Sequence, residues 1–371
     1  MQKIIIFNSN SFIYGAERGL INLVRALKQD YKITVVLPSR GPLVKYLKAE
    51  EIKIKISPLP ILILTFSPLY YLRYILLSVV NVFYFSFYII YYRFNIIYTN
   101  TALILFPLVI SKIVNRPHIW HLREFFSYNF VNRFIRWMGE HFSSKIVCMS
   151  ENIKNNLFTS KRDIKIIYEA LDFYQYKNYR CPKEEFKIFR DSVVISMISR
   201  IHPLKGQYEF LKFAEDIFRN EDIVLLIVGD ITPKAFKNFI YKKKIKNFVR
   251  VRKLEKKIYL LGFREDIDRI LSLSDICVFP FLRNEPLGLA MLEALAFGKK
   301  VLFNPNRGAM EVNSFFENKG EILSKNNLRR IIGEIKGVYP KQKVFIPVVF
   351  SFDFYKKDIT SFVDYVVKNN P

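Results

Sequence analysis

The sequence predicts an α/β protein of two domains, each built on a parallel β-sheet that is covered by helices. Short apolar runs alternate with helical segments along the whole chain, which is typical of strands buried on both faces. The chain has 371 residues, enough for two cores of ordinary size. A polar stretch rich in Tyr and Lys, which contains Cys181 and Pro182, separates the two halves.

The predicted elements follow one another as strand, helix, strand. In the first half, strands are predicted at 4–7, 33–37, 52–56, 96–99, 118–121, 146–149 and 164–168. The second half repeats the pattern at 193–198, 223–228, 258–261, 276–279 and 300–303. The predicted domains are therefore residues 1–172 and 191–351, with 173–190 as the linker and 352–371 as a final helix. The run at 4–7 is too short for a signal-peptide core.

The composition limits the kinds of partner that the protein can bind. The chain carries 58 Lys and Arg against 33 Asp and Glu, a formal charge of +25, so nucleic acid, anionic lipid and sugar nucleotides all fit its sign. The cation cluster at 234–257 has no nucleic-acid-binding signature, so we expect a solvated face and no nucleic-acid partner. Three widely spaced cysteines fit a reducing cytosol and imply no zinc site.

Two carboxylates, Glu285 and Glu293, lie eight positions apart between a predicted strand and a predicted helix. Glu285 is expected on the loop. Leu287 and Gly288 are expected to open the helix and, with Leu289, to offer backbone amides to an anion such as phosphate. Glu293 is expected about two turns further on, so the two carboxylates would contact different parts of one extended ligand.

Further residues of chemical interest lie at the ends of other strands, at the edge where parallel sheets bind ligands. They are Gly15 after the first strand, His121 at the end of the fifth, Arg200 and Lys205 after the first strand of the second half, and Gly262 and Phe263 after its third. Fixed cations such as Arg200 and Lys205 stabilise the charge that builds up on a departing phosphate. The turn at Gly15 is not G-x-G-x-x-G, so a nicotinamide site is poorly supported.

Taken in order, these motifs resemble the retaining glycosyltransferases of family 4. The resemblance extends over both halves and rests on the E-x7-E spacing of Glu285 and Glu293 and on Arg200 and Lys205, five positions apart. It implies the GT-B fold, in which two Rossmann-like domains with parallel sheets face an interdomain cleft.

A further match is the segment from Arg307 to Glu311, which resembles the family's loop beyond the E-x7-E helix. The sequence departs from the family pattern at two places. Tyr14 stands where a second Gly is usual, and the segment from Glu169 to Asp172 replaces the Asn-Gly-hydrophobic-Asp turn.

The resemblance implies a role for each motif. Arg200 and Lys205 would hold the diphosphate, Glu293 the ribose, Glu285 the donor sugar and Gly262 with Phe263 the base, while His121 and Gly15 would line the opposing wall. The implied reaction is of the hexosyltransferase type, with retention and without a metal or cofactor. Residues 1–172 would be the acceptor-side domain and 191–351 the nucleotide-sugar-binding domain, with 352–371 packing back on the first.

The acceptor is expected to be a saccharide or a lipid-linked saccharide in O-antigen- or capsule-type polysaccharide assembly. The basic surface fits an enzyme at the anionic inner face of the cytoplasmic membrane. Two other functions stay open, a GT-B-type sugar-nucleotide epimerase and a non-enzymatic basic protein that binds membranes or nucleic acid.

Residues 74–92 are 19 residues without a formal charge, which meets the length of a membrane span. A sheet strand follows directly, and crossing a bilayer would put two parts of one sheet on opposite sides. Two interpretations stay open for this segment, a helix lying at the membrane interface and an unusually apolar core helix.

Overall fold

The computed structural model describes residues 1–126, 128–158, 164–171, 183–186, 188–189, 191–232, 236–335 and 344–369. The chain divides into two compact units, Met1–Leu171 with Val348–Pro371 as unit 1 and Asp172–Pro347 as unit 2. Most of the predicted linker, including Cys181, lies outside the described residues, and Lys183–Phe186 forms a short 3-10 helix, η2.

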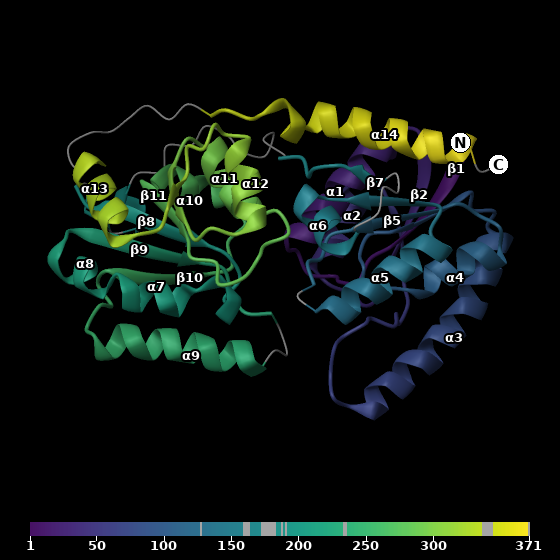
Figure 1. Cartoon of the computed structure of the whole chain (residues 1–371), viewed down its shortest axis with the longest axis horizontal. Helices are drawn as coiled ribbons and strands as arrows, with labels where there is room; N and C mark the ends of the chain where they lie inside the picture. The colour runs from purple at the N-terminus through teal and green to yellow at the C-terminus, as the bar shows by residue number, and fades with distance from the viewer. Residues whose placement is uncertain are drawn as a thin grey trace. The chain divides into compact units, whose positions relative to one another are not determined.

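Unit 1 is a seven-stranded parallel sheet in the order β3-β2-β1-β4-β5-β6-β7 (Figure 1). Its strands are β1 (Gln2–Phe7), β2 (Tyr31–Leu37), β3 (Lys53–Ile56), β4 (Ile96–Thr99), β5 (His118–Leu122), β6 (Lys145–Cys148) and β7 (Ile164–Ile166). Ile4 and Ile6 of β1 pack into one core, and Ile5 and Phe7 pack into another. Successive side chains point to opposite faces of a strand, so both faces of this sheet are buried.

Helices cover the two faces of this sheet. They are α1 (Gly15–Leu27), α2 (Pro42–Ala49), α3 (Pro68–Tyr91), α4 (Phe106–Ile113), α5 (Asn129–Phe142), α6 (Glu151–Leu157), the 3-10 helix η4 (Val348–Phe350) and α14 (Phe352–Lys368). Tyr355, Ile359 and Val363 of α14 are buried in the same core as Ile4 and Ile6. The final helix therefore belongs to unit 1 although it ends the chain.

Unit 2 is a six-stranded parallel sheet in the order β10-β9-β8-β11-β12-β13. Its strands are β8 (Val193–Ile198), β9 (Ile223–Val228), β10 (Ile258–Gly262), β11 (Ile276–Phe279), β12 (Lys300–Phe303) and β13 (Glu321–Ile322). Its helices are η3 (Pro203–Lys205), α7 (Gln207–Phe213), α8 (Glu215–Asn220), α9 (Phe236–Val251), α10 (Ile267–Leu273), α11 (Leu289–Ala296), α12 (Arg307–Ser314) and α13 (Lys325–Ile335).

All the predicted strands are present, and the differences have local causes. Strand β7 ends at Ile166, before the predicted Tyr168, whose ring packs against Phe350. That contact, and a hydrogen bond from Leu171 N to Phe350 O of 2.9 Å, place 348–350 in unit 1 and not in the predicted second domain. The sequence did not predict β13, because a strand of two residues is too short to show the alternation of apolar and polar residues that identifies a strand.

The order of strands marks one place in each sheet. The chain winds outward from the first strand on one side and then returns to its other side, so the order reverses between β1 and β4 in unit 1 and between β8 and β11 in unit 2. Loops at the carboxyl ends of the two strands diverge at such a switch point and leave room for a ligand.

Candidate functional site

In unit 2, a cation and a carboxylate meet at the switch point. Lys205 lies after β8 and Glu285 lies after β11, and Lys205 Nζ is 2.6 Å from Glu285 Oε2. A backbone hydrogen bond from Leu282 N to Leu204 O of 3.0 Å joins the same two loops. Both charged side chains are mostly buried, at 18% and 14% exposed, so solvent screens their interaction only partly.

Gly206 allows these loops to approach each other. Its φ is +74°, a conformation that other residues rarely adopt, and a Cβ placed there would lie 2.1 Å from the Pro280 carbonyl oxygen. The Lys-Gly pair that ends the loop after β8 therefore supplies both the cation and the close backbone contact.

Helix α11 begins later than the sequence predicted. Gly288 is its N-cap, with a φ of +75°, and the first helical residue is Leu289. Leu287 lies outside the helix and its side chain is fully buried, so it does not open the helix. Glu293 lies in the second turn and is only 6% exposed. The amides at the start of α11 still face the loop end of the helix, where an anion is stabilised.

A third loop completes this edge. Asn306 caps α12, and its side-chain oxygen also accepts a hydrogen bond from Glu285 N at 3.3 Å. Arg307 N donates to the Asn284 side chain at 3.2 Å. Arg307 therefore begins a helix, whereas its motif had predicted a loop, and the helix start fixes the backbone that carries Glu285.

The remaining predicted residues of unit 2 lie further along the same edge. Arg200 follows β8 and has an exposed side chain, whose Nη1 lies 3.5 Å from Thr232 Oγ1. Gly262 ends β10 with a φ of +71°, and Phe263 after it is 52% exposed. An exposed aromatic ring at a ligand edge can stack on a planar group such as a nucleotide base.

In unit 1, the two loops at the switch point are joined by neutral groups. Asn100 follows β4 and donates through Nδ2 to Asn8 Oδ1 after β1 at 2.9 Å. Gly15 begins α1 close by in sequence, with Tyr14 as its N-cap. Gly15 and His121 thus belong to unit 1, and the other predicted site residues belong to unit 2.

A buried ion pair lies beneath this edge. Arg123 and Glu169 are hydrogen-bonded to each other and are 1% and 2% exposed. Arg123 Nε donates to Asn100 Oδ1 at 2.8 Å, and Arg123 Nη2 lies 3.3 Å from His121 Nδ1. Gly19 of α1 leaves the space for the pair, because a Cβ there would lie 2.2 Å from Glu169 Oε2.

His121 is held in one protonation state. A guanidinium can only donate, so His121 Nδ1 accepts and the ring proton is on Nε2. The Tyr98 hydroxyl is also 2.7 Å from Nδ1. Burial, and then the neighbouring Arg123 charge, lower the pKa of His121 well below its usual range, so the ring is neutral. Its buried Nε2 has no hydrogen-bond partner among the described residues, so this donor is unsatisfied.

Glu17 is a second buried titratable group of this cluster. Its carboxylate accepts from Tyr14 N at 3.2 Å and from Asn8 Nδ2 at 3.5 Å, so it ties α1 to the loop after β1. Burial raises the pKa of Glu17 to about 7, against smaller opposing effects of these hydrogen bonds and of Arg123.

Sequence reasoning did not select Arg123, Glu169 or Asn100. The signals were present, since an Arg-Glu pair follows His121 directly and Glu169 replaces the Asn of the family turn. Only the fold shows that these positions, 46 residues apart in sequence, are paired.

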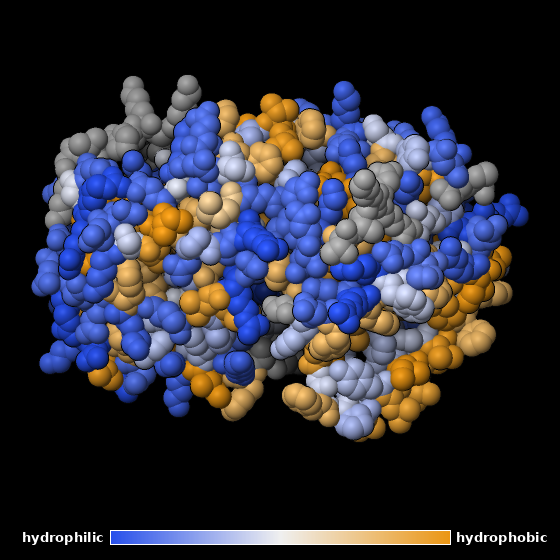
Figure 2. Space-filling model, in the orientation of Figure 1, coloured by the Kyte–Doolittle hydropathy of each residue, from blue (hydrophilic) through white to orange (hydrophobic). Residues whose placement is uncertain are grey.

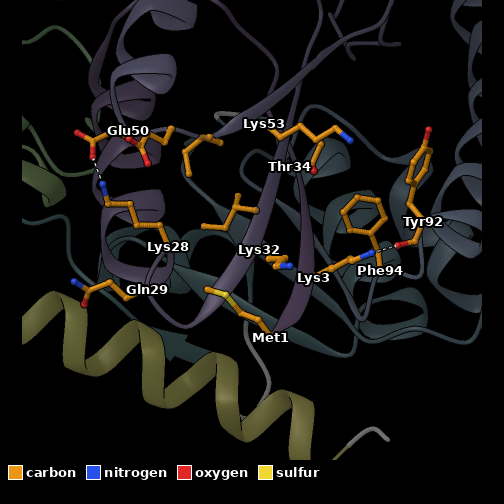
Figure 3. Close-up of a pocket in the computed structure, with 13 residues that line it drawn as sticks. Met1, Lys3, Lys28, Gln29, Lys32, Thr34, Glu50, Lys53, Tyr92 and Phe94 are labelled. Carbon is orange, nitrogen blue, oxygen red and sulfur yellow. Dashed lines mark hydrogen bonds and ion pairs between the residues drawn. The ribbon is translucent and has the colours of Figure 1, made fainter.

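A cavity of about 650 Å³ lies elsewhere in unit 1 (Figure 3). Its lining includes Lys3, Lys32 and Lys53 near the amino ends of β1, β2 and β3. Figure 3 shows Lys3 reaching the Tyr92 carbonyl and Lys28 reaching Glu50, so two of its cations already have partners. This cavity is at the sheet edge opposite to Gly15 and His121 and does not belong to the predicted site.

Among the residues that the structure describes, no group of three or more His, Cys, Asp or Glu side chains is arranged to hold a metal ion. Independence of a metal stays a prediction.

Two family models match the chain, one for each half. The model described as Glycosyltransferase Family 4 matches residues 13–173, and the model described as Glycosyl transferases group 1 matches residues 182–343.

The chain is similar to curated relatives over part of its length. It is 25% identical over 214 residues to the uncharacterized glycosyltransferase MJ1069 of Methanocaldococcus jannaschii, which covers 51% of this chain and 52% of the relative. It is 29% identical over 203 residues to the UDP-Gal:alpha-D-GlcNAc-diphosphoundecaprenol alpha-1,3-galactosyltransferase of Escherichia coli, covering 53% and 49%. The chain thus spans about half the length of these relatives.

Among solved structures, Anabaena Alr3699/HepE in complex with UDP and glucose has the same fold. The TM-score is 0.78 at 21% identity, and the match covers 98% of this chain and 100% of that chain.

Proposed function

Since the chain belongs to family 4 of the glycosyltransferases and has their GT-B fold of two parallel-sheet domains, we propose that it transfers a sugar from a nucleotide-diphosphate sugar to an acceptor hydroxyl. The observation that carries the proposal is the pairing of Lys205 with Glu285 at 2.6 Å across the switch point of unit 2. This pair lies at the edge where parallel sheets bind ligands, and we assign the cation to the diphosphate and the carboxylate to the sugar.

The leaving group determines what the cations do. Breaking the bond between sugar and diphosphate builds negative charge on the departing phosphate oxygens. Lys205, Arg200 and the first amides of α11 are positive groups on that edge, and such groups stabilise the charge without a metal. Lys205 is paired with Glu285, so the diphosphate has to share or replace this partner.

The two carboxylates have different proposed roles. Glu285 on the loop handles the donor sugar, while Glu293, in the second turn of α11, binds the ribose hydroxyls of the nucleotide. The buried Nε2–H of His121 donates to a hydroxyl of the sugar. Retention of configuration and independence of a metal or cofactor are part of the proposal and follow from the family.

The proposed acceptor is a lipid-linked saccharide in cell-envelope polysaccharide assembly at the inner face of the cytoplasmic membrane. The name of the Escherichia coli relative includes a diphosphoundecaprenol-linked sugar, and the +25 charge of this chain favours an anionic surface. This acceptor stays a proposal because that match covers 49% of the relative.

A panel of sugar nucleotides, starting with UDP-glucose, UDP-galactose and their N-acetyl forms, tests the donor. Binding is measured by calorimetry and hydrolysis by release of the nucleotide diphosphate. We expect Lys205→Met to weaken binding about tenfold or more, the loss of one charge-assisted contact. The control is Lys243→Met, an exposed lysine of α9, which should bind as the wild type does.

The same assay separates the alternatives. An epimerase would convert the donor sugar without an acceptor, and product analysis with donor alone would reveal it. A non-enzymatic basic protein would bind no sugar nucleotide with preference over a simple polyphosphate, and Lys205→Met would then match Lys243→Met. Either result would reject the proposed transfer.

A further inference from the structure

Helix α3 of unit 1 is mostly apolar around its whole circumference, but only one of its sides packs against the rest of the unit. Only Asn81, Phe85, Tyr88 and Ile89 are buried, and they lie in its second half. Its first half, 68–80, contains no buried residue, and Figure 1 shows that end extending away from the sheet. A helix that is apolar all round belongs in a core or in a membrane, and in α3 the most apolar 18-residue window is only 22% buried.

The exposed side of α3 is a continuous stripe. The residues that form it recur at helical spacing and are 54% to 74% exposed: Leu69, Leu72, Leu76, Val80, Phe83 and Phe87. Figure 2 shows hydrophobic side chains gathered over the position that α3 and α4 have in Figure 1. Monomeric soluble proteins rarely leave a contiguous apolar patch of this kind uncovered.

Helix α5 extends the surface. The helices lie in the order α3, α4, α5 in one layer, because α3 contacts α4 and α4 contacts α5. Phe130, Phe134 and Trp137 of α5 are 64%, 42% and 48% exposed, and the rings of Phe134 and Trp137 stack at 6.4 Å. Trp, whose ring is apolar but carries an N–H donor, is typical of the bilayer interface, and the two Phe rings add apolar area.

Positive charge outnumbers negative charge around this stripe. From residue 52 to the end of α5 at 142 the sequence has nine Lys and Arg residues and two acids. Glu124 is bonded to Thr101 and to Ala102 N, and Glu140 is exposed near the end of α5. On one flank of α3, Lys55 Nζ lies 5.0 Å from the ring centre of Tyr84 and 4.6 Å from that of Tyr88.

We infer that the outer faces of α3 and α5 form a bilayer-docking surface, on which α3 lies in the plane of the interface with its stripe among the acyl chains. The flanking cations then meet anionic headgroups. A second copy of this chain is a poor occupant, because two surfaces with the same excess of cations repel each other.

The two ends of α3 exclude a transmembrane orientation. Leu62, before the helix, donates its N–H to Leu103 O at 2.8 Å, and Asn95, after it, donates to Lys3 O at 2.9 Å. Both ends are thus tied to unit 1, and Phe85 and Ile89 pack in its core. The helix can rest on a bilayer but cannot cross it without unfolding the sheet.

The docking surface adjoins the ligand edge of unit 1. The loop before α3 is hydrogen-bonded to the loop after β4, and Glu124 after β5 holds that same loop. Docking would bring this edge to the membrane surface, where a lipid-linked acceptor presents its saccharide. Only the lipid-linked acceptor in this inference rests on the proposed function. The docking surface itself consists of residues of unit 1.

The test is flotation of the whole chain with vesicles of phosphatidylglycerol and phosphatidylethanolamine, against phosphatidylcholine alone. The triple variant Leu76→Glu, Phe83→Glu, Phe87→Glu should lower the partition coefficient roughly tenfold or more. The matched control changes three exposed apolar residues of α9 in unit 2 in the same way, Phe236, Phe239 and Ile240, and should bind as the wild type does. Equal binding of both variants, or no binding of the wild type, would overturn the inference.

Tryptophan fluorescence gives an independent measurement. Of the two Trp residues, Trp120 is buried and Trp137 is exposed on α5. Vesicles with brominated acyl chains should quench the wild type, and Trp137→Phe should remove the quenching. Quenching that persists in Trp137→Phe would reject the assigned orientation.

Nucleotide binding distinguishes this inference from the proposed function. A chain that binds UDP but no vesicles would refute the docking surface alone. A chain that binds vesicles but no sugar nucleotide would refute the transferase alone. Circular dichroism of the triple variant checks that it is folded, since its three positions are exposed and carry none of the core.

Discussion

Removing the charge of Glu169 should destabilise unit 1 more than removing any exposed charge. Arg123 and Glu169 are 1% and 2% exposed, so neither charge can turn to water when its partner is lost. Breaking a buried pair by changing one partner costs about 3–5 kcal/mol, and Glu169→Gln should lie near about 3 kcal/mol because the amide oxygen still accepts from Arg123. With a urea m-value of about 2 kcal/mol/M, this loss lowers the unfolding midpoint by about 1.5 M.

Urea unfolding followed by circular dichroism measures the effect. Lys154→Met is the control in the same unit, because its 4.0 Å contact with Glu151 is largely exposed and should be worth less than about 0.5 kcal/mol. The double variant Arg123→Met with Glu169→Leu should be more stable than Glu169→Gln, since no unpaired charge stays buried. A cost for Glu169→Gln within about 0.5 kcal/mol of the control would refute the reasoning.

Three further predictions follow from the same structure. The pKa of Glu17 is about 7 in the folded chain and about 4.3 in the unfolded chain, so the folded state binds this proton more tightly. The free energy of unfolding should therefore fall by about 2–3 kcal/mol as the pH rises from about 4.5 to about 7. In urea titrations at several pH values, Glu17→Gln should reduce this dependence on pH. Glu285→Gln should lower turnover about tenfold or more with nucleotide affinity unchanged or improved, whereas Glu293→Gln should mainly weaken nucleotide binding, and the reverse order in calorimetry and kinetics would overturn the assignment. Gly206→Ala should cost at least about 1–2 kcal/mol, because the Pro280 carbonyl cannot yield to a Cβ, and a stability equal to wild type would contradict this.

The sequence predicted the strands well because each is a short apolar run buried on both faces. It predicted the start of α11 less well. Leu is a good helix former, so Leu287 was expected in the helix. Gly288 adopts a φ of +75° as the N-cap, so the helix begins at Leu289, two residues later than expected. Backbone conformation at a single glycine depends on the contacts of the loop, and the sequence alone does not specify them.

In the candidate site too, the sequence predicts some features and not others. The types and order of Arg200, Lys205, Glu285 and Glu293 are visible in the sequence, and their motif spacing is enough to suggest a family. The ion pair of Lys205 with Glu285 is not visible, because it joins residues 80 positions apart through a close contact of two loops. The exposure of α3 is equally hidden, since an apolar run looks the same whether a sheet or a bilayer covers it.

The two switch points differ in how their charged side chains are placed. In unit 1, the loops after β1 and β4 are joined by Asn8 and Asn100, and the Arg123 guanidinium beneath them is paired with Glu169. In unit 2, the equivalent loops carry Lys205, which is paired with Glu285, and Arg200, whose side chain is exposed. A diphosphate gains more at the edge where cations and helix amides face outward than at one whose cation is buried and satisfied. This difference supports the proposal that the nucleotide binds unit 2 and that the neutral donor of His121 in unit 1 contacts an uncharged hydroxyl.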